Sequence, residues 1–295
     1  MDLYLGTAFW GWTLPKATCF ELLDRFYEAG FRYVDTATNY PINKIPGDFR
    51  KAEQWLLEWI DSRAVQDLHV CIKVGSINNE GTPDNLLSKS FLLMNLDLYQ
   101  HRFGDNLHTF MIHWDNRDDL DAIEESLEAL QIAQEKGLQP GLSGIRFPGN
   151  YLMANAKPAL DFHIQIKHNL LQSAYAQYRP FHGKPRFITY GINAGGIKLD
   201  GSYTGDSTLK TRGGDPAQFQ ARLQQLRQLC VGLQPPLIKM FQVGMLYAFH
   251  HPDVRGILVG PSNLQQLEST LDWYKALQSG QYQSHFQLLQ DWTEK

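Results

Sequence analysis

The sequence predicts a (β/α)8 TIM barrel, an α/β fold in which helices surround a closed parallel sheet. Short apolar runs alternate with longer amphipathic stretches, which is the pattern of repeated strand–helix units. The 295 residues fit eight such units, because barrels of this kind use about 250 residues for one core. The alternative, an open doubly wound sheet, would carry Gly-x-Gly-x-x-Gly in its first turn, and residues 6–12 lack that fingerprint. We therefore expect a single barrel domain over residues 1–295.

Eight segments have the length and the apolar, β-branched composition of buried parallel strands. In such a barrel the active residues lie at the carboxyl ends of the strands. The predicted strands are Leu3–Thr7, Tyr33–Thr36, Leu68–Val74, Thr109–His113, Gly141–Ile145, Phe162–Ile166, Phe187–Tyr190 and Gly256–Val259.

Amphipathic helices are predicted between the strands, among them Ala17–Ala29, Phe49–Ile60, Leu120–Glu135 and Pro216–Cys230. In the third of these, apolar residues recur at helical spacing, and acidic residues occupy the first turn, where the helix dipole favours them. Gly137 is expected to stop that helix. The segment Lys198–Pro216 is rich in Gly, Asp, Ser and Thr and is expected to be a long functional loop. A mostly helical tail, Asp272–Lys295, is expected after the last barrel helix.

The composition argues against several classes of partner. The net charge is −4, and the 27 basic and 31 acidic side chains are interspersed, so no basic stripe is available for nucleic acid. No apolar run approaches the roughly 20 residues of a membrane helix, and no signal peptide precedes the first strand. Cys19, Cys71 and Cys230 form neither a disulfide framework nor a metal-ligand spacing. We expect a soluble, cytoplasmic protein without a bound metal, whose oligomeric state the sequence leaves open.

Four polar residues lie where predicted strands end. Asp35 ends the second strand and Tyr40 follows in the adjoining loop, while Lys73 and His113 lie at the ends of the third and fourth. Charged groups in apolar strands are costly to bury without partners, so we expect these side chains to meet. Each residue also has a plainer interpretation by itself. Asp35 could cap a turn or helix, and Tyr40 could pack against a helix. Lys73 could extend its ammonium out of the strand end to solvent, and His113 could be structural.

The order of these residues resembles the aldo-keto reductase family, over nearly the whole chain. The resemblance is carried by Gly6-Thr7-Ala8-Phe9-Trp10-Gly11, Asp35-Thr36-Ala37-Thr38-Asn39-Tyr40, Lys73 and His113-Trp114. The family's catalytic tetrad is Asp, Tyr, Lys and His in this order, and all four match. The resemblance implies an oxidoreductase that reduces a small aldehyde or ketone, or catalyses the reverse. NADPH is the expected cofactor, with NADH as the alternative.

Carbonyl reduction explains why these residue types are needed. A hydride must reach the carbon and a proton the oxygen, and a phenol with an ordinary pKa of about 10 holds a proton at neutral pH and can pass it on. Lys73 beside Tyr40 would lower the pKa of that phenol, and Asp35 would hold Lys73 in place. His113 would donate a hydrogen bond that orients the substrate oxygen. Tyr40 is therefore the expected proton donor, with His113 as the second candidate.

The resemblance also implies a nicotinamide site on the later strands. Ser143 and Gln165 correspond to residues that bind the carboxamide, and Tyr190 to the aromatic residue that stacks on the ring. Gly144 replaces the family's usual Asn, so one of three expected hydrogen bonds is missing. Without the resemblance, a turn serine, a solvated glutamine and a core tyrosine explain these residues equally well. The glycines in residues 191–196 would let a phosphate approach the backbone closely.

The turn after the eighth strand is expected to hold the adenosine phosphate, through Gly260, Ser262 and Gln266. Ser262 or Asn263 serves equally well as an ordinary helix N-cap. NADPH-preferring members commonly have Arg where this chain has Gln266 and Asn where it has Thr270, which weakens the case for a tight 2′-phosphate site.

Three further predictions concern the long loop and the entrance to the barrel. Lys210 and Arg212 of the long loop are candidates to bind the 2′-phosphate in place of the missing Arg, or are simply solvated charges. Trp10 and Trp114 would line an aromatic mouth suited to an apolar carbonyl compound, with core packing as the alternative for Trp10. The stretch Pro41–Gly47 is unusual after the family's Tyr and is expected to reshape the entrance.

Two other classes of function stay open at this point. A nicotinamide-binding regulatory or scaffold protein would share the fold, although such a protein need not keep all four tetrad residues. A metal-dependent barrel hydrolase would use His113 and Asp115, which lie on one face of a strand, but the remaining histidines form no obvious ligand set. Turnover of NADPH with an aldehyde, and metal analysis of the purified protein, separate these alternatives.

Overall fold

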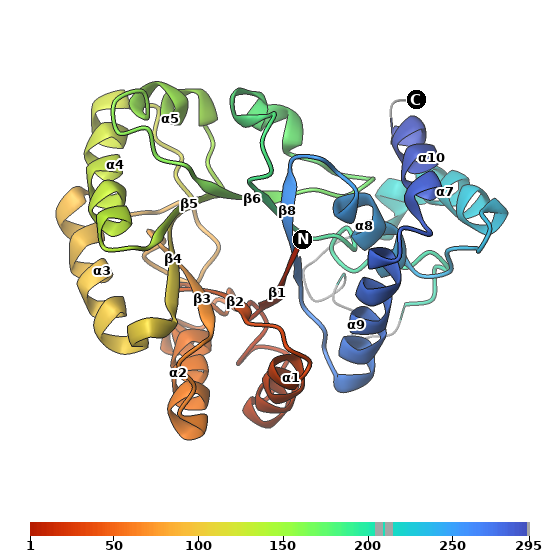
Figure 1. The fold of residues 1–295 in the computed structure, drawn as a ribbon, viewed down its shortest axis with the longest axis horizontal. Coiled ribbons are helices and arrows are strands. Elements are labelled where there is room, and N and C mark those ends of the chain that lie inside the picture. The colour runs from red at the N-terminus through yellow and green to blue at the C-terminus, as the bar shows by residue number, and fades with distance from the viewer. Residues whose placement is uncertain (204–208, 210–214, 294–295) are drawn as a thin grey trace.

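The strands of the protein form a closed, all-parallel barrel in chain order (Figure 1). The computed structural model describes residues 1–203, 209 and 215–293, so Lys210 and Arg212 lie outside the described residues. The first and last strands pair with each other, which closes the sheet and confirms the predicted TIM barrel. The strands are β1 Asp2–Gly6, β2 Tyr33–Ala37, β3 His69–Val74, β4 Leu107–His113, β5 Gln139–Ser143, β6 His163–Lys167, β7 Phe187–Tyr190 and β8 Val254–Val259.

All eight predicted strands are present, and their bounds differ by a few residues at most. The largest difference is in β5, which was expected to run to Ile145 but ends at Ser143. The physical reason is Gly144, whose φ of 69° is left-handed and cannot continue an extended strand.

Helices cover the outside of the barrel, and the described ones are α1 Lys16–Glu28, α2 Lys51–Arg63, α3 Lys89–Phe103, α4 Leu120–Glu135, α5 Pro148–Ala154, α7 Gln220–Gly232, α8 Met240–Phe249, α9 Leu264–Gln278 and α10 Gln283–Thr293. The prediction for α4 is confirmed at both ends. The side chain of Asp119 caps it by accepting a hydrogen bond from the Ala122 amide at 3.1 Å, and Gly137 follows with a φ of 88°.

Several predicted helix bounds are wrong. The helix expected over Phe49–Ile60 begins at Lys51, because Arg50 is left-handed with a φ of 68°, and it continues to Arg63. The segment Pro216–Cys230 is a 3₁₀ turn, Pro216–Phe219, followed by α7, which continues to Gly232. The helix does not run through because the backbone of Phe219, with φ −115° and ψ 6°, is not α-helical. The predicted tail was to begin at Asp272, but this residue lies inside α9, which continues to Gln278 because Trp273, Tyr274 and Leu277 extend its buried face.

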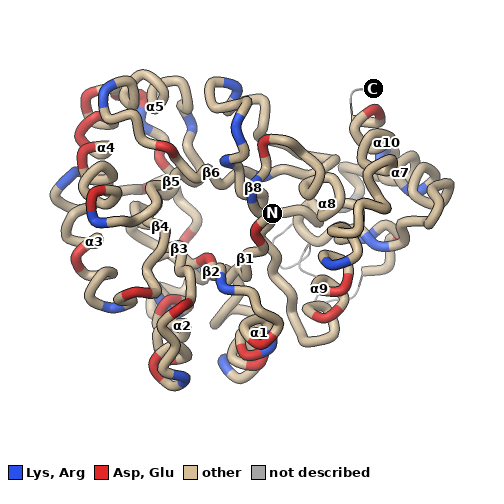
Figure 2. The backbone as a smooth tube through the Cα atoms, viewed as in Figure 1, with Lys and Arg blue, Asp and Glu red and all other residues tan. Residues whose placement is uncertain are grey.

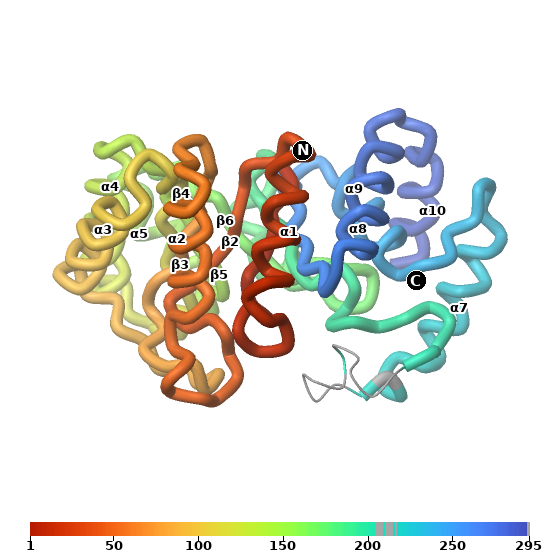
Figure 3. Tube along the Cα trace, turned by 90° about the horizontal axis from the view of Figure 1, so that it is seen from below, coloured from red at the N-terminus to blue at the C-terminus, as the bar shows by residue number. Residues whose placement is uncertain are grey.

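Helices α8, α9 and α10 group together at one end of the molecule, and α3, α4 and α5 at the other (Figure 3). Helix α7 contacts the first group, since the guanidinium of its Arg222 lies 4.9 Å from the ring centre of Trp292 on α10. Basic and acidic residues are scattered over most of the helices, although α5 and α8 carry none, and the described residues form no extended stripe of one sign (Figure 2). Within the part of the chain described here, no helix combines the length and apolarity needed to cross a membrane.

Candidate active site

A buried ion pair between Lys73 and Asp35 forms the centre of the candidate site. Strands β2 and β3 are in register, with Ala37 opposite Lys73, so Asp35 and Lys73 lie on the same side of the sheet. The ammonium of Lys73 donates to one carboxylate oxygen of Asp35, and the side-chain amide of Gln165 donates to the other. Burial alone would lower the pKa of Lys73, but the Asp35 carboxylate reverses this and raises the pKa, so Lys73 is an ammonium.

Tyr40 and His113 lie next to this pair. The Lys73 ammonium is 4.8 Å from the centre of the Tyr40 ring, and that ring meets the imidazole of His113 edge-on with 6.1 Å between ring centres. The backbone of Tyr40 is held at both ends, because its amide donates to the carbonyl of Ala37 at 3.1 Å and its carbonyl accepts from the amide of Ala52 on α2 at 3.3 Å. The structure therefore brings the four predicted tetrad residues together at the carboxyl ends of β2, β3 and β4.

The imidazole of His113 is neutral. Burial, and then the charge of Lys73, hold its pKa well below the ordinary value. Its Nδ1 atom is buried without a hydrogen-bond partner among the described residues. A neutral imidazole has one N–H to give and one nitrogen that accepts, so His113 can donate a hydrogen bond to a ligand without carrying a positive charge.

The predicted nicotinamide residues lie beside the tetrad. Ser143 is opposite His113 on β4 and opposite Gln165 on β6, and its hydroxyl donates to the Gln165 side-chain oxygen at 3.3 Å. A cavity of about 220 Å³ opens here, and Gly144, Gln165 and Tyr190 are among the residues that line it. An aromatic wall beside amide and hydroxyl groups fits a flat ring that carries a carboxamide.

The same cavity has lining residues that the sequence patterns did not single out. One ends β6, one follows β5, and two belong to the 3₁₀ segment Tyr175–Phe181; position at a strand end is the only sequence signal for the first two. The additional side chains are Arg146, Lys167, Gln177 and Tyr178.

The turn after β8 is exposed and uses its own polar groups. Asn263 caps α9 by accepting from the amide of Gln266 at 2.9 Å, and the Gln266 side chain accepts from the amide of Ser262 at 2.9 Å. The hydroxyl of Thr270 donates to the Gln266 carbonyl at 2.8 Å. A phosphate near Gly260 would therefore have to displace Gln266 from the Ser262 amide to use that donor.

The two tryptophans predicted at the mouth lie in different surroundings. Trp10 is 1% exposed and packs within the hydrophobic core, in agreement with the packing alternative. Trp114 is half-buried, and its ring lies 5.0 Å from that of His113. Of the two, Trp114 is the one that lies against the tetrad.

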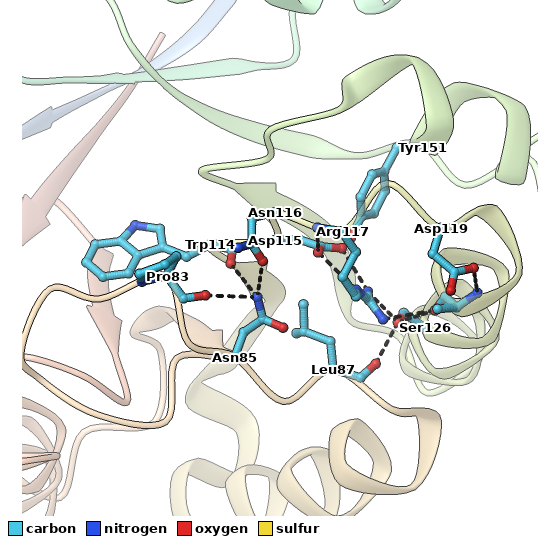
Figure 4. A network of polar contacts seen from close by, with 11 residues as sticks. Pro83, Asn85, Leu87, Trp114, Asp115, Asn116, Arg117, Asp119, Ser126 and Tyr151 are labelled. Atoms are coloured by element: carbon cyan, nitrogen blue, oxygen red, sulfur yellow. Dashed lines mark hydrogen bonds and ion pairs between the residues drawn. The ribbon is translucent and has the colours of Figure 1, made fainter.

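Asp115 has a structural role (Figure 4). Its carboxylate accepts from the amide, Nε and Nη2 of Arg117 at 2.8–2.9 Å and from the Tyr151 hydroxyl at 2.6 Å. Arg117 also donates to Ser126 on α4 at 2.9 Å. These contacts occupy the oxygens that a metal shared with His113 would need. In residues 1–203, 209 and 215–293, no three His, Cys, Asp or Glu side chains are grouped so as to hold a metal ion.

A parallel barrel with a lysine–carboxylate pair, a tyrosine and a neutral histidine at its strand ends defines the class of protein. The profile of the aldo/keto reductase family matches residues 2–285, and the chain belongs to this family. Family membership supports an oxidoreductase that acts on a carbonyl group with a nicotinamide cofactor.

Several named relatives are similar to the chain. Norsolorinic acid reductase stcV of Emericella nidulans is 26% identical, over 91% of this chain and 73% of that protein. The putative aryl-alcohol dehydrogenase AAD6 of Saccharomyces cerevisiae is 29% identical, over 48% of this chain and 66% of that protein. The probable aryl-alcohol dehydrogenase AAD4 of the same yeast is 30% identical, over 42% of this chain and 38% of that protein.

Proposed function

We propose that this chain reduces an aldehyde or ketone to an alcohol, with NADPH as the cofactor, NADH as the alternative, and Tyr40 as the proton donor. The observation that carries the proposal is the Lys73–Asp35 pair, buried against the Tyr40 ring. An ammonium at this place stabilises the phenolate that forms when Tyr40 gives up its proton. Buried ion pairs are weak sources of stability, which favours a chemical role for this one.

The bound nicotinamide would supply the hydride to the carbonyl carbon. Tyr40 passes its phenolic proton to the carbonyl oxygen, so C=O becomes CH–OH, and solvent returns a proton to the phenolate. The neutral His113 donates a hydrogen bond to the same oxygen and orients it without changing its own charge. Asp35 keeps the Lys73 ammonium in place. Gln165 and Tyr190, which line the cavity, and Ser143, which donates to Gln165, would hold the nicotinamide.

The substrate class follows from the site and from the relatives. Trp114 presents an aromatic surface beside His113, and the named relatives include aryl-alcohol dehydrogenases. An aromatic aldehyde is therefore the appropriate first probe. The buried cysteines Cys19, Cys71 and Cys230 are free thiols, which suits the reducing cytoplasm as the place of action.

The first prediction concerns the phenol. With NADPH and 4-nitrobenzaldehyde the purified protein is expected to oxidise the nucleotide, and Tyr40→Phe is expected to lower kcat by at least about 100-fold, the usual contribution of a positioned acid. The affinity for NADPH, measured by fluorescence titration, should stay nearly unchanged, because the hydroxyl is not assigned to cofactor binding. Parallel titration with NADH measures the cofactor preference.

Tyr27→Phe is the matched control. It removes a phenolic hydroxyl that donates to Asp67 on the outside of the barrel, so kcat should equal that of the unaltered protein. Normal turnover by Tyr40→Phe would refute the assigned role. Tight NADPH binding by the unaltered protein with no turnover of any aldehyde or ketone would favour a regulatory or scaffold protein instead.

A further inference from the structure

Trp114 has a strained backbone that its surroundings hold in place. Its φ is 59°, in the left-handed region that bulky residues avoid. The Trp114 amide donates to the carbonyl of Ser143 at 2.8 Å. The Trp114 carbonyl accepts from the side chain of Asn85 at 3.1 Å (Figure 4). The next residue, Asp115, is clamped by Arg117. Backbone strain that several contacts maintain is typical of functional sites, and Trp114 lies beside the tetrad.

The strained backbone places the indole against Gly144. A Cβ atom added at Gly144 would lie 2.5 Å from Cδ1 and 3.3 Å from Nε1 of Trp114. Cδ1 is close to the base of the side chain, and the backbone beneath it is held on both sides, so the ring cannot easily swing aside. The indole of Trp114 thus occupies the volume that a side chain at position 144 would need.

Position 144 is also where the family resemblance expects an asparagine that binds the nicotinamide carboxamide. The indole N–H is a donor, and it makes no hydrogen bond to another described residue. The indole Nε1 lies 3.3 Å from the position of the absent Cβ, which is within the region that the amide of an asparagine at position 144 would occupy. Gly144 lines the same cavity as Gln165 and Tyr190.

We propose that the indole N–H of Trp114 replaces the missing asparagine as a hydrogen-bond donor to the carboxamide of the bound nucleotide. The inference rests on the proposed function, and it gives Trp114 a role in cofactor binding beyond the substrate contact expected from the sequence. Gly144 and Trp114 then form a matched pair: the glycine makes room, and the indole supplies the donor.

The test compares two ligands by isothermal titration calorimetry. Trp114→Phe keeps an aromatic ring and removes the N–H, and it is expected to weaken NADPH binding about fivefold, the effect of losing one hydrogen bond. Binding of 2′-phospho-ADP-ribose, which lacks the nicotinamide, should not change. Trp292→Phe, on α10, is the matched control and should bind both ligands like the unaltered protein.

A double-mutant cycle tests the matched pair directly. Asparagine tolerates the left-handed φ of position 144, so steric conflict with the indole is the main effect of Gly144→Asn. This substitution should weaken NADPH binding when Trp114 is present and strengthen it in the Trp114→Ala background, where the amide has room to act as donor. Thermal unfolding of each variant shows whether it is folded.

Three results would overturn the inference. They are unchanged NADPH affinity in Trp114→Phe, an equal loss for both ligands, and a Gly144→Asn effect of the same sign in both backgrounds. If the unaltered protein still binds NADPH and reduces an aldehyde, such a result removes the role of Trp114 and leaves the proposed function intact. If the unaltered protein binds no nicotinamide nucleotide, the proposed function fails, and this inference fails with it.

Discussion

The Asp35 carboxylate neutralises an ammonium that is almost completely buried, with exposed side-chain fractions of 2% and 1% for the two partners. We predict that Asp35→Asn lowers the free energy of unfolding by about 3 kcal/mol, because it leaves the charge of Lys73 unpaired in the interior. It should also lower kcat, since Lys73 can then lose its proton and no longer favour the Tyr40 phenolate. Urea unfolding and steady-state kinetics measure the two effects.

The double variant Asp35→Asn with Lys73→Met separates stability from chemistry. Removing both charges should restore most of the lost stability, because an uncharged, well-packed pair often replaces a buried ion pair without loss. Turnover should stay low, as no ammonium remains beside Tyr40. A double variant as unstable as Asp35→Asn alone would show that the stability loss does not come from the unpaired lysine.

Some features of single residues in the site were predictable from the sequence, and others were not. The proximity of Asp35, Lys73 and His113 was predictable, because parallel strands carry their last residues to one rim. The left-handed backbone of Trp114 was not, since no residue type or spacing marks a bulky residue with positive φ. The contact of Gln266 with the Ser262 amide likewise depends on a rotamer that the sequence does not reveal.

The connection between β4 and α4 is the element on which the position of Trp114 depends. Arg117 joins Asp115, at the end of the strand, to Ser126 inside the helix. We predict that Arg117→Met lowers the free energy of unfolding by about 3 kcal/mol, since the buried Asp115 loses its cation. It should also lower kcat/KM for the aldehyde by releasing the strained backbone beside His113.

A helix cap in the same connection provides the control. Asp119→Ala removes the N-cap of α4 and should cost about 1 kcal/mol of stability. Its carboxylate touches neither Asp115 nor Trp114, so kcat/KM should stay unchanged. If Arg117→Met loses stability while kcat/KM stays normal, the connection supports the fold and does not position the site.

Whole elements were easier to predict than their bounds. Buried parallel strands are continuous apolar runs, and the eight such runs in this chain are the eight strands. Helix α8 is not among the helices named from the sequence, because seven of the ten residues of Met240–Phe249 are buried and the segment lacks the polar face that marks an amphipathic helix. Gly244 shows how tightly α8 packs, since a Cβ there would lie 2.1 Å from the carbonyl oxygen of Ile192.

At the scale of the whole molecule, the two ends of the barrel differ. The carboxyl end holds the tetrad, and the amino end holds three stacked histidines, His69, His108 and His163, from the beginnings of β3, β4 and β6. Adjacent rings have their centres 4.7 and 6.5 Å apart. Burial lowers the pKa of His108 to about 4 and that of His163 to about 3. At neutral pH His108 and His163 therefore pack as uncharged rings.

The lowered pKa values of His108 and His163 make the stability of the protein depend on pH. An unfolded histidine takes up a proton near pH 6.5, whereas His163 stays neutral in the folded protein down to about pH 3. Between these values the unfolded state binds more protons, so the stabilising contribution is complete above about pH 6.5 and is lost as the pH falls. Well below pH 6.5, where an unfolded histidine is fully protonated, His163 contributes about 1.4 kcal/mol per pH unit to that loss.

We predict that the free energy of unfolding, measured with urea at pH 7, 6 and 5, falls with acidification. His163→Phe should reduce the average slope by about 1 kcal/mol per pH unit, because the unfolded histidine is only partly protonated at the upper end of this range. Phenylalanine keeps a ring in the layer and removes the titrating group. His101→Phe, which replaces an exposed histidine on α3, is the control and should leave the slope unchanged. Equal slopes for His163→Phe and the unaltered protein would show that protonation of other groups drives acid unfolding, and that the layer at the amino end is only packing.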